Sequence, residues 1–446
     1  MSGAVNLATP VRRLLALAAA AWSRLWFQDR STLPLELSRI GIGAALLVNY
    51  GLATRYFFDF SGESAWIAQA AAAGRGDDPW QQSIFFYLTS PWQLLVCHSI
   101  FLLSCAAFMV GWRTSWVKWI VLVGEISYAH YNVVLSYGVD RILCSLLVIL
   151  CVAPIGRALS LDQVRAVRAA KREDLAALPA PYSSAWAGAC IRLMQIQMAA
   201  LFFYSAVYKL HGDDWLNGDV LWVVFSHANF YSPILLSLFA THFWLVNVAT
   251  YGTLLIEIAF PFLIWQRATR PYLLAAAIFL HLQIAIFMGM PYFSFVMIMG
   301  HMSFVRPEWL ADLGRAWKQR IGPMEIIYDG HCGFCRRSMA WLLAFDGMRQ
   351  IDIRDYRANP SPVVPSELVD KALYLVRPGG PALPGFEAYR YVVARVPGLW
   401  WLIPFFFVPV FSRLFGRPLY DWVAANRGRL SAWTNGQRRP QPEGAG

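Results

Sequence analysis

The chain has 446 residues, of which 57% are hydrophobic and only 15% are charged, with a mean hydropathy of +0.43. This composition excludes an ordinary soluble protein and indicates an integral membrane protein. The net charge of +11 could suggest nucleic-acid binding, but the basic residues cluster between apolar stretches rather than on one face of a soluble domain. We therefore expect the lipid bilayer, and no nucleic acid, as a partner.

The N-terminal segment, residues 1–30, combines a basic flank with an apolar run, as a secretory signal peptide does. Trp22, Arg24 and Trp26 stand where a signal peptide would carry small residues for cleavage. We therefore expect an uncleaved interfacial helix whose arginines reach to the aqueous surface, with cleavage as the alternative.

Residues 31–310 predict a helical membrane domain of about eight spans, because a span needs about 20 apolar residues. The stretch 220–240 is also apolar, but Ser226, His227, Asn229 and Pro233 interrupt it, so we interpret it as a re-entrant or interfacial segment. The expected spans are 35–54, 92–111, 116–135, 139–156, 187–208, 244–265, 271–289 and 291–305.

Lysine and arginine distinguish the loops between these spans. They concentrate before the first span, between the second and third, after the fourth, between the sixth and seventh, and after the eighth. These are alternate loops, so the positive-inside rule places both termini in the cytoplasm. The stretch 174–184, "DLAALPAPYSS", predicts a linker on the same side. We expect the protein in a bacterial inner membrane.

From about residue 322 the composition changes, and aspartate, arginine and proline become frequent. "MEIIYDG" (324–330) predicts a buried strand, the residues from Cys335 to Phe345 a helix, and "RQIDIRDY" (349–356) and "ALYLV" (372–376) two more strands. The expected fold class is a polytopic all-α membrane domain followed by a small α/β domain. The α/β domain covers 322–432, lies in the cytoplasm, and precedes a disordered tail, 433–446.

Cys332 and Cys335 form a Cys-x-x-Cys pair between the first of these strands and the helix. Cys332 stands at the helix start, where the helix dipole and free N–H groups stabilise a thiolate, so we predict that it is the nucleophile. Cys335 lies one turn later, and we expect it to be buried beneath Cys332. From there it can resolve a mixed disulfide by attacking Cys332. Arg336 and Arg337 add positive potential. Such a dithiol requires no cofactor.

Metal binding is the alternative use of the two thiols. One Cys-x-x-Cys pair supplies only two of the four ligands of a structural zinc, and no second pair with metal spacing follows. Haem attachment needs a histidine after the second cysteine, where Arg336 stands. A soft-metal carrier loop remains open. We favour a redox dithiol with no resident metal, and we expect the other five cysteines to pack inside apolar spans: Cys97, Cys105, Cys144, Cys151 and Cys190.

"YDGHCGFC" (328–335), together with "LYDWVAANRGRL" (419–430), resembles the DCC family of thiol-disulfide oxidoreductases, named for an Asp-x-x-Cys-x-x-Cys motif. Asp329, Cys332 and Cys335 match that motif, and the resemblance covers about 324–432. It implies a thioredoxin-like fold with these three catalytic residues and a thiol or disulfide partner, protein or small molecule. Lys371 stands near the third strand, where thioredoxin has a proline. The stretch 399–411 could lie on the membrane surface or form a buried helix.

"AVYKLHGDDWLNG" (206–218) and "HLQIAIFMGMPYFSFVMI" (281–298) resemble the HTTM group, the membrane domain shared with vitamin K-dependent gamma-carboxylases. The resemblance covers about 30–305. It implies that Lys209 is a base that deprotonates a reduced quinone, which would be the cofactor. It does not extend to the large exoplasmic domain that engages the propeptide, so we do not expect peptide carboxylation. The other membrane-domain candidates are His211, Gln197, Trp215, Asp140, Glu257 and His281.

Each of these membrane-domain residues also has a structural interpretation. A lysine near the end of a span commonly anchors it at the interface. Polar residues inside apolar spans, including Arg39, commonly pair between helices.

Three functions remain open. The first is a membrane-bound thiol-disulfide oxidoreductase, a protein-disulfide reductase of the DCC type, coupled to a membrane domain of unknown substrate. The second is a carboxylase-like or quinone-modifying enzyme with Lys209 as base. The third is a non-enzymatic membrane scaffold.

Overall fold

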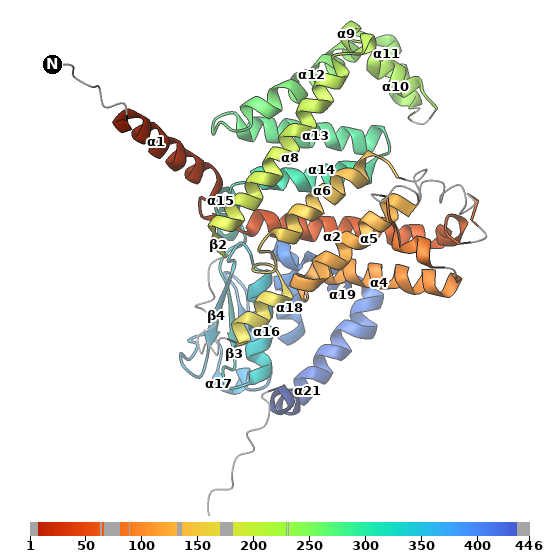
Figure 1. Ribbon diagram of the computed structural model, residues 1–446. Helices are drawn as coiled ribbons and strands as arrows, with labels where there is room; N and C mark the ends of the chain where they lie inside the picture. Colours follow the sequence, from red (N-terminus) through yellow and green to blue (C-terminus); the bar gives the residue numbers. More distant parts are fainter. Residues whose placement is uncertain are drawn as a thin grey trace, which may run out of the picture. The chain divides into compact units, whose positions relative to one another are not determined.

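The computed structural model describes residues 8–62, 65–66, 81–88, 90–131, 136–169, 182–228, 230 and 232–434, and Figure 1 traces the chain. Most of the predicted linker 174–184 and nearly all of the predicted tail 433–446 lie outside these residues. The chain divides into two units. The first comprises Met1–Ile155 and Ser183–Val305, and the second comprises Gly156–Tyr182 and Arg306–Gly446.

The first unit is helical, apart from a pair of two-residue antiparallel strands, β1 (Arg30–Ser31) and β2 (Ser183–Ser184). Its helices are α1 (Ala8–Trp26), α2 (Leu33–Ala53), η1 (Thr54–Asp59), η2 (Ile84–Tyr87), α4 (Pro91–Val110), α5 (Thr114–Tyr131), α6 (Gly138–Val152), α8 (Ala185–Lys209), α9 (Asp213–Asn217), α10 (Val220–Ser226), α11 (Pro233–Thr241), α12 (Trp244–Leu263), α13 (Arg270–Phe287), α14 (Pro291–His301) and η4 (Met302–Phe304).

Within the described residues, five helical segments are long and apolar enough to cross a membrane: Leu33–Asp59, Pro91–Val110, Ala185–Lys209, Trp244–Leu263 and Arg270–Phe287. The other three predicted spans coincide with α5, α6 and α14. With 15 and 11 residues, α6 and α14 reach about 22 and 16 Å at 1.5 Å per residue, less than a hydrocarbon core of about 30 Å.

The interrupted apolar stretch 220–240 forms two short helices, α10 and α11, instead of one span. Phe225 from α10 and Leu235 and Phe239 from α11 are buried in one small cluster with Val246 of α12. The two helices therefore pack back on the end of α12.

A buried ion pair within α2 contacts the end of α4 through hydrogen bonds of its arginine. The Arg39 guanidinium lies 2.7 Å from Glu36, and both side chains are completely buried. Arg39 also donates to the backbone carbonyls of Phe108 (2.5 Å) and Met109 (2.7 Å). The last carbonyls of a helix have no partner within the helix. The Gly111 N–H donates to the Phe108 carbonyl at 3.2 Å, and Arg39 adds a charged donor to both carbonyls in an apolar interior.

The second unit contains the expected α/β domain. After α15 (Pro307–Ile321) its elements are β3 (Met324–Tyr328), α16 (Gly333–Phe345), β4 (Ile351–Asp355), α17 (Ser366–Val369), β5 (Tyr374–Val376), β6 (Leu383–Pro384) and α18 (Gly385–Arg395). The strand order is β4-β3-β5-β6; β3 and β4 are parallel, and the other pairs are antiparallel. This mixed sheet confirms the predicted fold class, a helical membrane domain followed by a thioredoxin-like α/β domain.

One face of this sheet packs against a helix that the sequence analysis did not predict. Helix α7 (Leu161–Ala169) lies far from the domain in sequence but belongs to the second unit. Its Val164 is buried with Ile326 of β3 and Met339 of α16. The alternate strand residue, Ile327, packs with Tyr356 on the opposite face.

The last described elements form a helical hairpin: η5 (Pro397–Leu402), α19 (Ile403–Phe407), α20 (Pro409–Phe411), η6 (Ser412–Gly416) and α21 (Arg417–Thr434). Leu399 is fully buried in the core, and the Phe406 ring stacks on Phe386 of α18 at 5.1 Å. Trp400 and Phe405 are exposed. The stretch 399–411 is therefore only partly buried, so it is not the wholly buried helix of one predicted alternative; its location at the membrane surface stays a prediction.

Candidate functional site

The Cys-x-x-Cys pair lies where β3 passes into α16. Cys332 caps α16, and its sulfur accepts a hydrogen bond from the backbone N–H of Cys335 at 3.3 Å. The backbone N–H of Cys332 donates to the Asp329 carbonyl at 3.2 Å, which closes the turn. The strand thus ends, turns and begins a helix within four residues, and the first thiol sits at the positive end of the helix dipole.

The pair is in its reduced form, and both side chains are half-buried. The expectation that Cys335 is buried is therefore corrected: it packs at the edge of the hydrophobic core, beside α16 residues that are fully buried. Its position one turn after Cys332 still allows its sulfur to reach the first one, because residues three apart lie on the same helix face.

The pKa of the Cys332 thiol is lowered from 9.0 to about 6. The largest cause is a hydrogen bond with the Cys335 thiol, and backbone N–H groups of Cys335 and Phe334 lower the pKa further. Partial burial and the charge of Asp329 raise it. Hydrogen bonds to the thiolate therefore outweigh desolvation, so Cys332 is mostly ionised at neutral pH.

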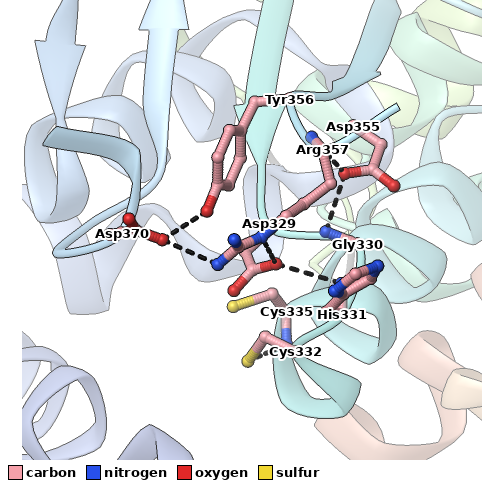
Figure 2. Close-up of polar contacts among 9 residues, drawn as sticks. All are labelled: Asp329, Gly330, His331, Cys332, Cys335, Asp355, Tyr356, Arg357 and Asp370. Atoms are coloured by element: carbon pink, nitrogen blue, oxygen red, sulfur yellow. Dashed lines mark hydrogen bonds and ion pairs between the residues drawn. The ribbon is translucent and has the colours of Figure 1, made fainter. Parts of the chain in front are cut away.

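Asp329, the acidic residue of the motif, is held in an ion pair (Figure 2). Its carboxylate lies 3.2 Å from the Arg357 guanidinium and accepts from the His331 backbone N–H at 3.0 Å. Arg357 is braced in turn by Asp370 at 2.8 Å and lies over the Tyr356 ring, 4.8 Å from its centroid. The negative charge beside the dithiol is therefore balanced by a positioned guanidinium.

Asp355 connects the Arg357 backbone to the turn that carries the dithiol. Its carboxylate accepts from the backbone N–H groups of Gly330 (2.9 Å) and Arg357 (3.0 Å) (Figure 2). Tyr328, the last residue of β3, pairs with Asp355 in the parallel register, so the carboxyl ends of both strands meet at one edge of the sheet. Sequence reasoning named neither Asp355 nor Arg357. The signal for them was "RDYR" (354–357), directly after the second predicted strand.

Lys209 and Glu257, two membrane-domain candidates, lie together. The Lys209 ammonium is 2.5 and 2.7 Å from the Glu257 carboxylate oxygens and 2.6 Å from the Ser205 hydroxyl. It also lies 5.0 Å from the centroid of the Trp215 ring. Side-chain exposure is only 19% for Lys209 and 10% for Glu257, so this is a largely buried pair between α8 and α12.

The other candidates have separate partners. The Gln197 amide donates to Ser145 at 3.1 Å, and the His211 ring bonds to the Val207 carbonyl at 2.7 Å. His281 is buried against the ring of His301, 5.4 Å away between centroids, and its two ring nitrogens have no hydrogen-bond partner among the described residues.

Asp140 lies in the first turn of α6, where its carboxylate accepts from the Tyr137 backbone N–H at 2.8 Å. It also lines a cavity of about 260 Å³ whose other walls are mainly aromatic, including Tyr50, Phe57 and Tyr128. Lys209 is not among the described residues that line this cavity. Asp140 and Lys209 are thus not brought into one cavity.

Within the described part of the chain, no group of three or more histidine, cysteine, aspartate or glutamate side chains is placed to hold a metal ion. The dithiol contributes two sulfurs, and its near neighbours are the ion-paired Asp329 and Arg357.

Fold and site together define a membrane protein that carries a thioredoxin-like domain with a reduced dithiol. Comparison with protein families finds an HTTM domain over residues 77–309 and a DCC1-like thiol-disulfide oxidoreductase over residues 326–433. The first match covers just over half of the chain, so the chain belongs to the HTTM domain family and carries a DCC1-like domain behind it. Both predicted resemblances are confirmed. No curated protein and no solved structure matches the chain.

Proposed function

We propose that the protein is a membrane-bound thiol-disulfide oxidoreductase whose reaction takes place at Cys332 and Cys335. The observation that carries the proposal is the lowered pKa of Cys332 at the start of α16, with Cys335 one turn behind it. A thiolate at neutral pH beside a second thiol is the arrangement that disulfide exchange requires. The DCC1-like match over 326–433 supports the same activity.

In the proposed reaction, the Cys332 thiolate attacks one sulfur of a substrate disulfide. The substrate S–S bond breaks, its second sulfur leaves as a thiolate, and a mixed disulfide forms on Cys332. Cys335 then loses its proton to solvent and attacks the Cys332 sulfur, which releases the first substrate sulfur. Two electrons pass to the substrate, and an external thiol, small or protein-borne, must reduce the resulting Cys332–Cys335 disulfide.

Trapping tests this proposal. A Cys335→Ser variant keeps the attacking sulfur but lacks the resolving one, so mixed disulfides through Cys332 should accumulate and identify the partner. The matched control is Cys332→Ser, which should trap far less. Equal trapping by both variants, or none by either, would contradict the proposed roles.

We also propose that the dithiol domain faces the cytoplasm of a bacterial cell, where thiols are kept reduced. The alternation of basic loops supports this orientation. A membrane-impermeant maleimide added to intact cells should leave Cys332 unlabelled and should label it after lysis. Labelling of Cys332 before lysis would invert the orientation.

Quinone chemistry in the membrane domain is a second candidate function. It is supported by the HTTM match and by the largely buried contact between Lys209, Glu257 and Ser205. A reduced quinone would supply the acidic hydroxyl, and Lys209 would accept its proton. Lys209 is held in an ion pair with Glu257, and a protonated amine cannot accept a second proton. The two side chains must therefore separate, or Glu257 must take up the lysine proton, before Lys209 can act as a base.

A further inference from the structure

The C-terminal hairpin exposes a connected apolar surface. We define the hairpin face as Phe405, Val410, Phe411, Leu414, Phe415 and Leu419, whose exposed fractions lie between 46% and 64%. The Phe411 ring lies 6.3 Å from that of Phe405 and 6.4 Å from that of Phe415, so the members adjoin one another. Surfaces of this kind mark sites of interaction with proteins or membranes.

The hairpin face is not needed to fill the core of the domain. Other residues of the same hairpin do that, since Leu399 is fully buried and Phe406 stacks on Phe386. On α21 the Tyr420 ring lies 5.9 Å from Tyr389. The hairpin therefore has two sides, one packed on the domain and one apolar and uncovered.

Arginine outnumbers acidic residues in the hairpin. Arg413 and Arg417 are exposed within the hairpin face, and Asp421, beside it on α21, is the one acidic residue in the sequence between Glu387 and the end of α21. Trp400 and Trp422 are exposed in the same hairpin, at 47% and 56%. Arginine with tryptophan and phenylalanine is the composition of segments that lie at the surface of anionic membranes.

The hairpin has the bend of a broken span or of a re-entrant segment. Pro397–Phe407 and Pro409–Asn426 together are apolar enough to count as a membrane span, but they are bent by 75° at the break between them. Prolines 404 and 409 lie near this break, and proline interrupts helices. A bent pair of short helices fits the interfacial layer better than a straight crossing.

We propose that the hairpin face inserts into the interfacial layer of the bilayer, so that the thioredoxin-like domain is held on the membrane surface. The occupant is lipid with anionic headgroups. The first unit already anchors the chain in a bilayer through its apolar helices. Insertion of the hairpin face is then an intramolecular step, in which the domain loses little translational freedom. The proposal is independent of the proposed exchange activity, because it concerns only where the domain lies.

Position-specific fluorescence in the full chain tests insertion. In a variant with Cys332→Ser and Cys335→Ser, Phe411→Cys is labelled with an NBD dye and reconstituted into vesicles that contain phosphatidylglycerol with brominated acyl chains. The matched control is Val363→Cys, which replaces another exposed apolar residue, next to the cluster on the opposite face of the sheet. The parent without an introduced cysteine gives the background, and Leu414→Cys repeats the test at a second position.

We expect brominated chains to quench NBD at positions 411 and 414 and to leave position 363 unquenched. Unquenched dye at both hairpin positions would overturn the proposal. In that case, crosslinks from position 411 to the membrane helices, or to a second copy of the chain, would show which protein surface covers the hairpin face instead.

Discussion

Arg357 and Asp329 are 28 residues apart in the sequence, yet their side chains form an ion pair of 3.2 Å beside the dithiol. Asp329 raises the pKa of Cys332 by its charge. Hydrogen bonding to Asp329 raises the pKa of Arg357 in turn, so the guanidinium stays charged. Arg357 is thus placed to offset the Asp329 charge, which opposes ionisation of Cys332.

The first prediction follows from this pair. Arg357→Gln should raise the Cys332 pKa, because Asp329 is then left without its counter-charge, whereas Asp329→Asn should lower it. The double variant should resemble Asp329→Asn alone. The pH dependence of Cys332 alkylation measures all three. Arg354→Gln is the matched control, since Arg354 pairs with Glu325 at 2.8 Å in the same sheet; a shift of equal size there would remove the specific role of Arg357.

The second prediction concerns pH. The rate of Cys332 alkylation should rise with a midpoint near pH 6, the lowered pKa of this thiol. Because the pKa is lower in the folded protein than in the unfolded chain, ionisation stabilises the reduced fold at high pH. That stabilisation should be lost as the pH falls through about 6. Thermal unfolding of the reduced protein and of Cys332→Ser across this range should converge at low pH. An alkylation midpoint near 9 would contradict the prediction.

The central part of the site could be predicted from the sequence, and its surroundings could not. Asp329, Cys332 and Cys335 lie within seven residues, so a strand and a helix start are enough to bring them together. Arg357 and Asp370 reach the site only because β4 pairs in parallel with β3. The pairing of β3 with β4 depends on the packing of the whole domain core. That core includes Val164 of α7, which comes from a distant part of the chain.

Gly330 carries the third prediction. A Cβ atom at this position would lie 1.8 Å from the Asp355 carboxylate oxygen. Gly330→Ala should therefore displace Asp355 from the Gly330 and Arg357 N–H groups, lowering stability by about 1–3 kcal/mol and slowing Cys332 alkylation. Gly428→Ala is the control, since an added Cβ meets nothing within 4 Å there. Thermal unfolding measures the stability of the two variants. An equal loss of stability in Gly330→Ala and Gly428→Ala would rule out the proposed contact.

The fourth prediction concerns the buried pair in the membrane domain. Arg39→Met should destabilise the fold by about 3–5 kcal/mol, because it removes the guanidinium that pairs with the buried Glu36 carboxylate and donates to the Phe108 and Met109 carbonyls. Arg315→Met removes an exposed pair with Asp312 and should cost less than about 1 kcal/mol. Unfolding in detergent measures the stability of both variants. Similar losses of stability would show that burial does not make the Arg39–Glu36 pair more important than the exposed pair.

Span length shows a second limit of sequence interpretation. A run of apolar residues records composition but not where a helix begins and ends. The run 291–305 includes Pro291, which starts α14, and its helix ends at His301 after 11 residues. Helix α6 begins at Gly138, one residue before the predicted start, but it ends at Val152, four residues before the predicted end. Hydropathy therefore located these helices correctly and overestimated their lengths.

Lys209 carries the last prediction, because it separates the quinone function from a purely structural ion pair. Lys209→Arg should keep the pairing with Glu257 and so keep wild-type stability, while Lys209→Ala should lose stability that Glu257→Gln restores in the double variant. Guanidinium remains protonated and cannot accept a proton, so we expect the Arg variant to fold and yet fail in any reaction that consumes a reduced quinone. Measured in membranes, an Arg variant with full activity would show that Lys209 acts through its charge alone.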